Sequence, residues 1–139
     1  LNECPHEVRD RLIIEILETT ALDDTTTVMK NLSVCRNTGL CISLDDFGTG
    51  YSSLAYLHKF PVDTIKIDRS FVEAMNGSPE GREIPRSIIL LANSLDMDVV
   101  AEGVETEEQR EFVRKEGCKY YQGFLRAKPM SASAFLSLT

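Results

Sequence analysis

Long apolar runs are missing from this sequence of 139 residues. None approaches the roughly 20 residues that a membrane-spanning helix requires, and the first residues lack the basic and then apolar pattern of a secretory signal peptide. None of the four cysteines lies in a C-x-x-C pair, which disfavours a zinc or redox motif. We therefore expect a cytoplasmic location without direct membrane insertion. This expectation leaves open a membrane-tethered parent protein.

Cationic residues are in the minority. The chain has 15 Lys and Arg against 22 Asp and Glu, which gives a net charge of −7. Proteins that bind DNA or RNA polymers cluster Lys and Arg against the phosphates, so we expect neither polymer as a partner. A small phosphate ligand would need a metal ion or a local Lys or Arg to offset the negative field of the chain.

Two further kinds of motif are absent. The only histidines are His6 and His58, and both lie away from the faces of the predicted strands. The dinucleotide-binding pattern G-x-G-x-x-G does not occur, and residues 47–50 (FGTG) are the nearest approach to it. A zinc site and a dinucleotide-binding fold are therefore poorly supported.

Short apolar stretches alternate with amphipathic helical patterns along the chain. Strands are expected at 12–18, 41–46, 63–68, 98–104 and 119–122, and helices at 24–38, 53–59, 80–95, 106–116 and after Ser131. Alternating strands and helices predict an α/β fold with a parallel sheet and right-handed crossovers. Two architectures satisfy this order: an open doubly wound sheet, or part of a (β/α) barrel.

Each predicted strand has an apolar side and an opposite side with one charged or amide residue, usually close to its C-terminal end. These residues are Glu15, Asp45, Lys66, Glu102 and Gln122. One such residue alone is more often a helix cap or a surface ion pair. Ionised side chains are rarely buried without partners, so a charged or amide residue on each of five consecutive parallel strands indicates a site. The C-terminal mouth of a (β/α) barrel is where such a site lies.

Carboxylates predominate among these candidates, since Asp46 follows Asp45 directly. Hard oxygen ligands suit Mg²⁺ or Mn²⁺ better than zinc. Lys66 is held charged by neighbouring carboxylates and can steer the attacking hydroxide or a phosphate oxygen. Without an obvious nucleophile, the set favours metal-assisted hydrolysis of a phosphate ester. At this stage two simpler interpretations stay open: Lys66 pairs with Asp63 or Asp68, and Gln122 satisfies backbone groups.

Four segments of the chain closely resemble the EAL-domain family of cyclic di-GMP phosphodiesterases, in the order found in that family. They are residues 45–54 (DDFGTGYSSL), 61–68 (PVDTIKID), 100–106 (VAEGVET) and 122–124 (QGF). The resemblance implies a TIM-like barrel that binds cyclic di-GMP at its C-terminal mouth. It also implies Mg²⁺ or Mn²⁺ as the cofactor that activates water to give linear pGpG.

The resemblance further implies individual roles for residues. The implied metal ligands are Glu15, Asp45, Asp46 and Glu102. Lys66 matches the lysine that orients the catalytic water, beside the catalytic carboxylates Asp45 and Glu102. Glu105 and Gln122 match residues that support the ligand pocket. Glu18 matches a glutamate that anchors the loop at 47–53, which couples the metal site to the dimer contact in the family.

The chain is too short for the whole fold that the resemblance implies. A TIM barrel needs ~250 residues, and the family's Glu-Ala-Leu signature, a nearby Arg and a metal-binding Asn do not occur here. We therefore expect residues 1–139 to form the C-terminal half of a TIM-like EAL barrel, inactive alone, in a homodimer or an assembly that completes the half barrel. The alternatives are a non-catalytic cyclic di-GMP receptor or regulatory interaction module, and a structural fragment.

Overall fold

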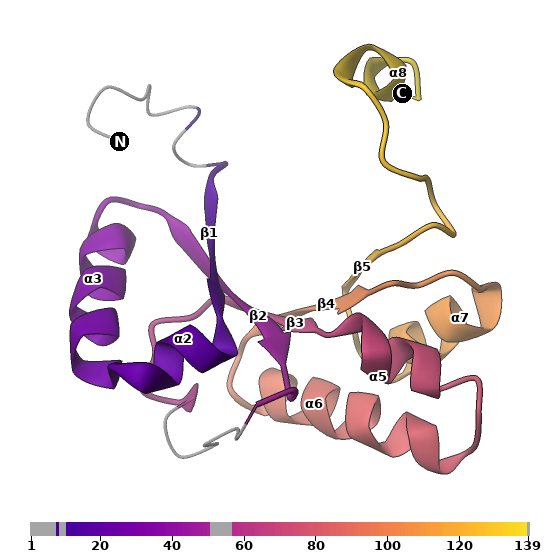
Figure 1. Cartoon of the computed structure of the whole chain (residues 1–139), viewed down its shortest axis with the longest axis horizontal. Helices are drawn as coiled ribbons and strands as arrows, with labels where there is room; N and C mark the ends of the chain where they lie inside the picture. The colour runs from indigo at the N-terminus through magenta and orange to yellow at the C-terminus, as the bar shows by residue number, and fades with distance from the viewer. Residues whose placement is uncertain (1–7, 9–10, 51–56, 139) are drawn as a thin grey trace.

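A five-stranded parallel sheet forms the centre of the computed structural model, which describes residues 8, 11–50 and 57–138. The strands are β1 (Ile13–Leu17), β2 (Cys41–Phe47), β3 (Thr64–Ile67), β4 (Asp98–Glu102) and β5 (Tyr120–Gln122). Their order in the sheet is their order in the chain, so β1 and β5 occupy the two edges. All four neighbouring pairs are parallel, and the C-terminal ends of all five strands therefore lie at one end of the sheet (Figure 1).

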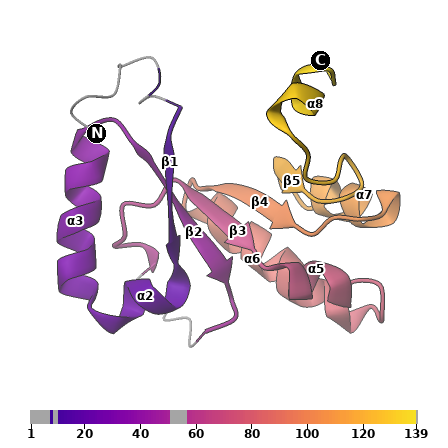
Figure 2. The same ribbon diagram turned by 45° about the horizontal axis from the view of Figure 1, so that its top comes forward.

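Helices connect the strands. They are α2 (Glu18–Asp23), α3 (Thr25–Asn37), α5 (Arg69–Ala74), the 3₁₀ turn η1 (Glu80–Arg82), α6 (Glu83–Ser94), α7 (Glu107–Lys115) and α8 (Ala132–Leu136). The two views show α3, α6 and α7 around the outside of the curved sheet, whereas α8 lies apart, beyond an extended segment that follows β5 (Figures 1 and 2). Within the described ranges, no helix has both the length and the apolar character needed to cross a membrane.

The core lies between the sheet and its outer helices. Ile42, Ile65 and Val99 on the strands and Ile89 and Ala92 on α6 are almost completely buried. The other side of the sheet is partly open, and the β1 side chains of Ile13 and Leu17 are exposed there. This two-sided pattern confirms the α/β fold with a parallel sheet and the strand faces predicted from alternation.

Two short helices were not anticipated from the sequence. Residue 18, predicted to end the first strand, begins α2 instead, and α5 follows β3 directly. Six-residue helices are too short to show a 3.6-residue apolar period. Asp68 caps α5 by accepting a hydrogen bond from the Ser70 N–H at 3.0 Å. The helix predicted at 53–59 falls largely outside the described residues, although Leu57 is helical and buried.

Candidate metal and substrate site

Polar side chains from four strands meet around one lysine near the C-terminal ends of β1 to β4. The Lys66 Nζ atom on β3 lies 3.2 Å from Glu15 Oε1, 3.0 Å from Asp45 Oδ1 and 2.8 Å from Glu102 Oε1. These carboxylates come from β1, β2 and β4. The three donors of the ammonium group therefore each reach a carboxylate, and the pairing with Asp63 or Asp68 considered from the sequence is not the one observed.

Lys66 is charged at this position. Its residue is only 8% exposed, and burial by itself lowers the pKa of an ammonium group. Hydrogen bonds to Glu102, Asp45 and Glu15 outweigh burial and raise the Lys66 pKa above its ordinary value. The cluster thus holds a permanent positive charge among carboxylates at neutral pH.

Asp46 occupies an unusual backbone conformation at the end of β2. Its φ is +54°, in the left-handed region that few residues other than glycine adopt. The Asp46 N–H donates to Asp45 Oδ1 at 3.1 Å. Burial raises the pKa of the Asp46 carboxyl, the charges of Asp45 and Asp68 add to this, and Lys66 opposes it. Strained backbone of this kind is concentrated at functional sites.

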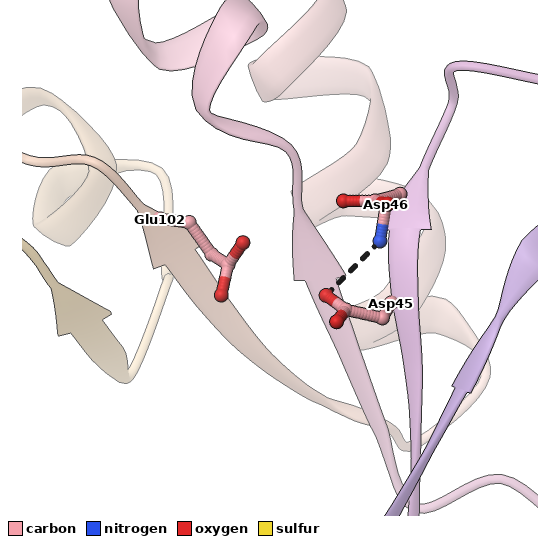
Figure 3. A group of neighbouring side chains, drawn as sticks. All are labelled: Asp45, Asp46 and Glu102. Carbon is pink, nitrogen blue, oxygen red and sulfur yellow. Dashed lines mark hydrogen bonds between the residues drawn. The ribbon is translucent and has the colours of Figure 1, made fainter.

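Asp45, Asp46 and Glu102 form a group of carboxylates with the chemistry of a divalent-ion site. One oxygen atom from each lies within 4.8 Å of the others, and the side chains of Asp45 and Glu102 extend toward each other from β2 and β4 (Figure 3). Oxygen-only donors of this kind fit Mg²⁺ or Mn²⁺. Glu15 also contacts Lys66, but its carboxylate is not among these three.

The site opens into a groove of about 1010 Å³ beside β4 and β5. Glu102, Glu105 and Gln122 line its polar end, and Glu105 Oε1 lies 3.1 Å from a guanidinium nitrogen of Arg69. Apolar side chains also line the groove, and those of α8 include Phe135 and Leu136. The groove therefore combines charged groups with a large apolar wall, as ligand sites for organic molecules do.

Glu18 reaches the loop that follows β2. The residue is 3% exposed, and its Oε2 atom accepts a hydrogen bond from the Gly48 N–H at 2.8 Å. Gly48 has a φ of +96°, and a Cβ atom there would lie 3.0 Å from the Phe71 ring, so only glycine fits without strain. Part of the loop predicted at 47–53 lies outside the described residues, which end at Gly50 in this segment.

Sequence reasoning missed two residues beside the groove. Arg69 lies one residue after the 61–68 segment, pairs with Glu105, and covers Gly103 so closely that a Cβ atom there would overlap its side chain. Arg69 could have been proposed from the sequence, because it comes shortly after the predicted strand that carries Lys66. Gln109 lies within the helix predicted at 106–116. It forms a capping box with Thr106 at the start of α7, and its buried amide has a further bond that no local pattern indicates.

Comparisons with known proteins agree on one family. Residues 2–129 match the family model of the EAL domain. MucR of Pseudomonas aeruginosa, named a bifunctional diguanylate cyclase/cyclic di-GMP phosphodiesterase, is 43% identical over 126 residues, which are 91% of this chain and 18% of MucR.

Solved structures share the fold. The MucR phosphodiesterase in complex with cyclic di-GMP has a TM-score of 0.88 and 42% identity, covering 91% of this chain and 51% of that one. The manganese and cyclic di-GMP complex of Klebsiella pneumoniae BlrP1 has a TM-score of 0.77 and 36% identity, covering 84% of this chain and 30% of that one. The chain thus spans about half of the solved MucR phosphodiesterase and less than a fifth of full-length MucR.

Proposed function

Because the chain belongs to the EAL domain family, we propose that its carboxylate cluster forms part of the active site of a metal-dependent cyclic di-GMP phosphodiesterase. The observation that carries this proposal is the convergence of three carboxylates from three strands on Lys66, directly beside Asp46. Such a cluster suits hydrolysis of a phosphodiester that carries negative charge, provided that a divalent ion offsets the carboxylates.

Asp45, Asp46 and Glu102 are the proposed ligands of Mg²⁺ or Mn²⁺, with Glu15 as a fourth. Their oxygen atoms supply the hard donors that these ions require. When bound, a divalent ion supplies water activation and neutralises charge on the phosphodiester. Support for a divalent ion also comes from BlrP1, which was solved as a manganese and cyclic di-GMP complex.

Lys66 is proposed to orient the attacking water. Its Nζ atom lies at the centre of the carboxylates and offers three N–H donors. Because the pKa of Lys66 is raised, the group acts by donating hydrogen bonds and by its charge. It does not accept a proton at neutral pH.

Substrate binding is proposed for Gln122 and Glu105, and anchoring of the 47–53 loop for Glu18. Gln122 and Glu105 line the groove beside Glu102, and their oxygen atoms can accept hydrogen bonds from the N–H groups of guanine. Glu18 already holds the Gly48 N–H, close to Asp46 in the chain. These roles place the substrate on the β4 and β5 side of the carboxylates.

Catalysis is proposed for a complete domain and not for this chain alone. The chain spans about half of the solved MucR phosphodiesterase, and we propose residues 1–139 as the C-terminal half of an EAL domain. Its partners would be cyclic di-GMP and either a second copy of the chain or a segment that completes the half barrel. The proposed location is the cytoplasm.

A chimera tests the proposed reaction. Residues 13–138 replace the corresponding segment of the MucR phosphodiesterase, and chromatography follows the conversion of cyclic di-GMP to pGpG in Mn²⁺. We expect the chimera to hydrolyse the substrate and the Asp45→Asn variant to lose at least about 100-fold in rate, beyond the 10- to 100-fold typical of residues outside the ligand shell. The Asp98→Asn variant should leave the rate unchanged, because Asp98 begins β4 whereas Glu102 of the carboxylate cluster ends it.

Two results of this experiment would contradict the proposal. A chimera that binds cyclic di-GMP but forms no pGpG would indicate a receptor module. Equal rates for Asp45→Asn and Asp98→Asn would remove the carboxylate cluster from the reaction. Manganese binding to the 139-residue chain, measured by electron paramagnetic resonance, checks the ion site separately, since Asp45→Asn should weaken it and Asp98→Asn should not.

A further inference from the structure

One buried amide joins three segments beside the groove. Gln109, in the first turn of α7, is 3% exposed. Its Oε1 atom accepts hydrogen bonds from the Glu105 N–H at 2.8 Å and the Thr106 N–H at 3.0 Å. Its Nε2 atom donates to the Val72 carbonyl at 3.1 Å. Both ends of the amide are thus engaged, and the carbonyl belongs to α5, on a different part of the chain.

The bond to Val72 satisfies a buried carbonyl near the end of α5. The last four carbonyls of a helix have no partner within it, and Val72 is fully buried, out of reach of solvent. A buried carbonyl without a hydrogen bond is unfavourable. Gln109 supplies that bond, so the buried end of α5 is fixed to α7 through a single side chain.

The two accepted bonds hold the connection between β4 and α7. This connection carries Glu105, whose carboxylate pairs with Arg69 at the start of α5. Therefore α5 is joined to the connection at the groove through Arg69 and Glu105, and to α7 in the interior through Val72 and Gln109. A capping box alone requires only Thr106 and Gln109, so the bond to α5 is additional to capping.

We infer that Gln109 is a positioning residue that sets the place of Glu105 and Arg69 at the rim of the groove. It touches neither the carboxylate cluster nor the groove. Its loss would release the backbone at Glu105 from one side and α5 from the other, so the groups that meet the substrate would be held less precisely. The kinetic part of this inference rests on the proposed function, whereas the structural part does not.

Three substitutions separate positioning from helix capping. Gln109→Met removes all three side-chain bonds at similar volume. Gln109→Glu keeps two acceptor bonds but, when ionised, cannot donate to Val72. Thr106→Val removes the Thr106 Oγ1 atom that accepts from the Gln109 N–H at 3.2 Å, yet leaves the Gln109 amide in place. Gln109→Glu preserves a test if Gln109→Met does not fold.

Amide hydrogen exchange on the 139-residue chain gives the structural readout. We expect Gln109→Met to speed exchange of the Glu105 amide by about 10-fold or more, because its part-buried hydrogen bond to Gln109 protects it. Thr106→Val should leave that amide protected. In Gln109→Glu the Glu105 amide should stay protected while the amides of α5 exchange faster. Unchanged exchange at Glu105 in Gln109→Met, or at α5 in Gln109→Glu, would overturn the inference.

Steady-state kinetics in the MucR chimera give the functional readout. Gln109→Met and Gln109→Glu should raise KM for cyclic di-GMP by about 10-fold with kcat changed less than about 2-fold, as expected for a residue that acts through substrate-binding groups. Thr106→Val should change neither. Equal KM values for all variants, or the same rise in Thr106→Val, would overturn the inference while the proposed function stands. If the unmodified chimera forms no pGpG, the proposed function fails, and amide exchange alone decides the inference.

Discussion

At the scale of single residues, charge balance governs the site. Lys66 supplies one positive charge against four nearby carboxylates, those of Glu15, Asp45, Asp46 and Glu102. The chain without a divalent ion therefore carries excess negative charge at this point. Burial raises the pKa of Asp46, and the charges of Asp45 and Asp68 raise it further. A bound cation would relieve this repulsion.

The first prediction concerns the cost of ionising Asp46. Its pKa is raised from 3.8 in the folded chain, so the folded state binds this proton more tightly than the unfolded state. The contribution of this proton to the free energy of unfolding is fully present below pH 3.8, and it is lost as pH rises through the raised pKa of Asp46. Asp46→Asn should therefore raise the midpoint of thermal unfolding at pH 7 in EDTA. Asparagine also tolerates the positive φ of Asp46.

Calorimetry across a pH series checks this expectation. The difference between the variant and the unmodified chain should shrink as the buffer approaches pH 4, because both side chains are then neutral for more of the time. Addition of Mn²⁺ should favour the unmodified chain instead. Coincident midpoints at pH 7 in EDTA would contradict the sign derived for Asp46.

A second prediction contrasts two thiols. Cys118 is 7% exposed, and burial raises its pKa to about 11 despite hydrogen bonds with backbone groups that lower it. At pH 8 roughly one molecule in a thousand then carries the reactive thiolate. Cys41 is exposed. Iodoacetamide should therefore modify Cys41 well before Cys118 in the native chain, as read by peptide mass spectrometry. In urea, both cysteines should be modified at similar rates. Similar rates for Cys41 and Cys118 in native buffer would contradict the burial of Cys118.

At the scale of elements, the junction between α5 and α6 depends on one glycine. Gly81 lies in η1, and a Cβ atom there would overlap the backbone carbonyl of Ala74. Gly77 in the same connection has room, since its Cβ atom would lie 3.6 Å from the Ala74 oxygen. The backbone carbonyl cannot move aside as the end of a flexible side chain can, so the two positions should differ in their response to a methyl group.

The third prediction uses these glycines as a matched pair. Gly81→Ala should lower the free energy of unfolding by about 1–3 kcal/mol, the range for steric overpacking. Gly77→Ala should change it by no more than about 0.5 kcal/mol. Urea unfolding followed by circular dichroism measures both. If Gly77→Ala proved as damaging as Gly81→Ala, close backbone approach would not be the reason.

The sequence was most informative where a local period determines structure. Alternation along the strands predicted which side of the sheet is apolar and that Glu15, Asp45, Lys66 and Glu102 share the other side. The helix predicted at 106–116 corresponds to α7. Helices α2 and α5 are too short to carry a period, and the partners of Lys66, Arg69 and Gln109 depend on how strands and helices are placed against one another. The pattern of residues within a single strand or helix does not predict how the strands and helices pack against one another.

At the scale of the whole molecule, the sheet has an open inner face and two edges. Ile13 and Leu17 on β1 and Tyr120 on β5 are exposed on this face, and Phe135 and Leu136 of α8 are exposed beyond it. Open strand edges recruit further strands, and apolar surface of this extent favours association. The open face lies beside the groove and the carboxylate cluster, so whatever covers it also borders the site.

The fourth prediction is therefore that the chain does not remain a monomer. Light scattering coupled to size-exclusion chromatography should give a mass above 15.6 kDa for the isolated chain, with no formation of pGpG. Replacing Leu136 with Asp should reduce association, while Leu138→Asp, farther along the chain, should have a smaller effect. A monodisperse monomer that hydrolyses cyclic di-GMP would contradict both the assembly and the need for a second half.

The order of the strands in the sheet also bears on how the chain reaches its folded state. Every strand pairs with its neighbour in the sequence, so the sheet can grow one strand–helix–strand unit at a time, and each unit closes one crossover connection. Glu15 from β1 and Glu102 from β4 meet only at Lys66, and this requires four strands in register. The full cluster of carboxylates around Lys66 can therefore form only after β1, β2, β3 and β4 have all been placed in the sheet. The repulsion among these carboxylates is a cost of the assembled sheet and is absent from any single strand–helix–strand unit.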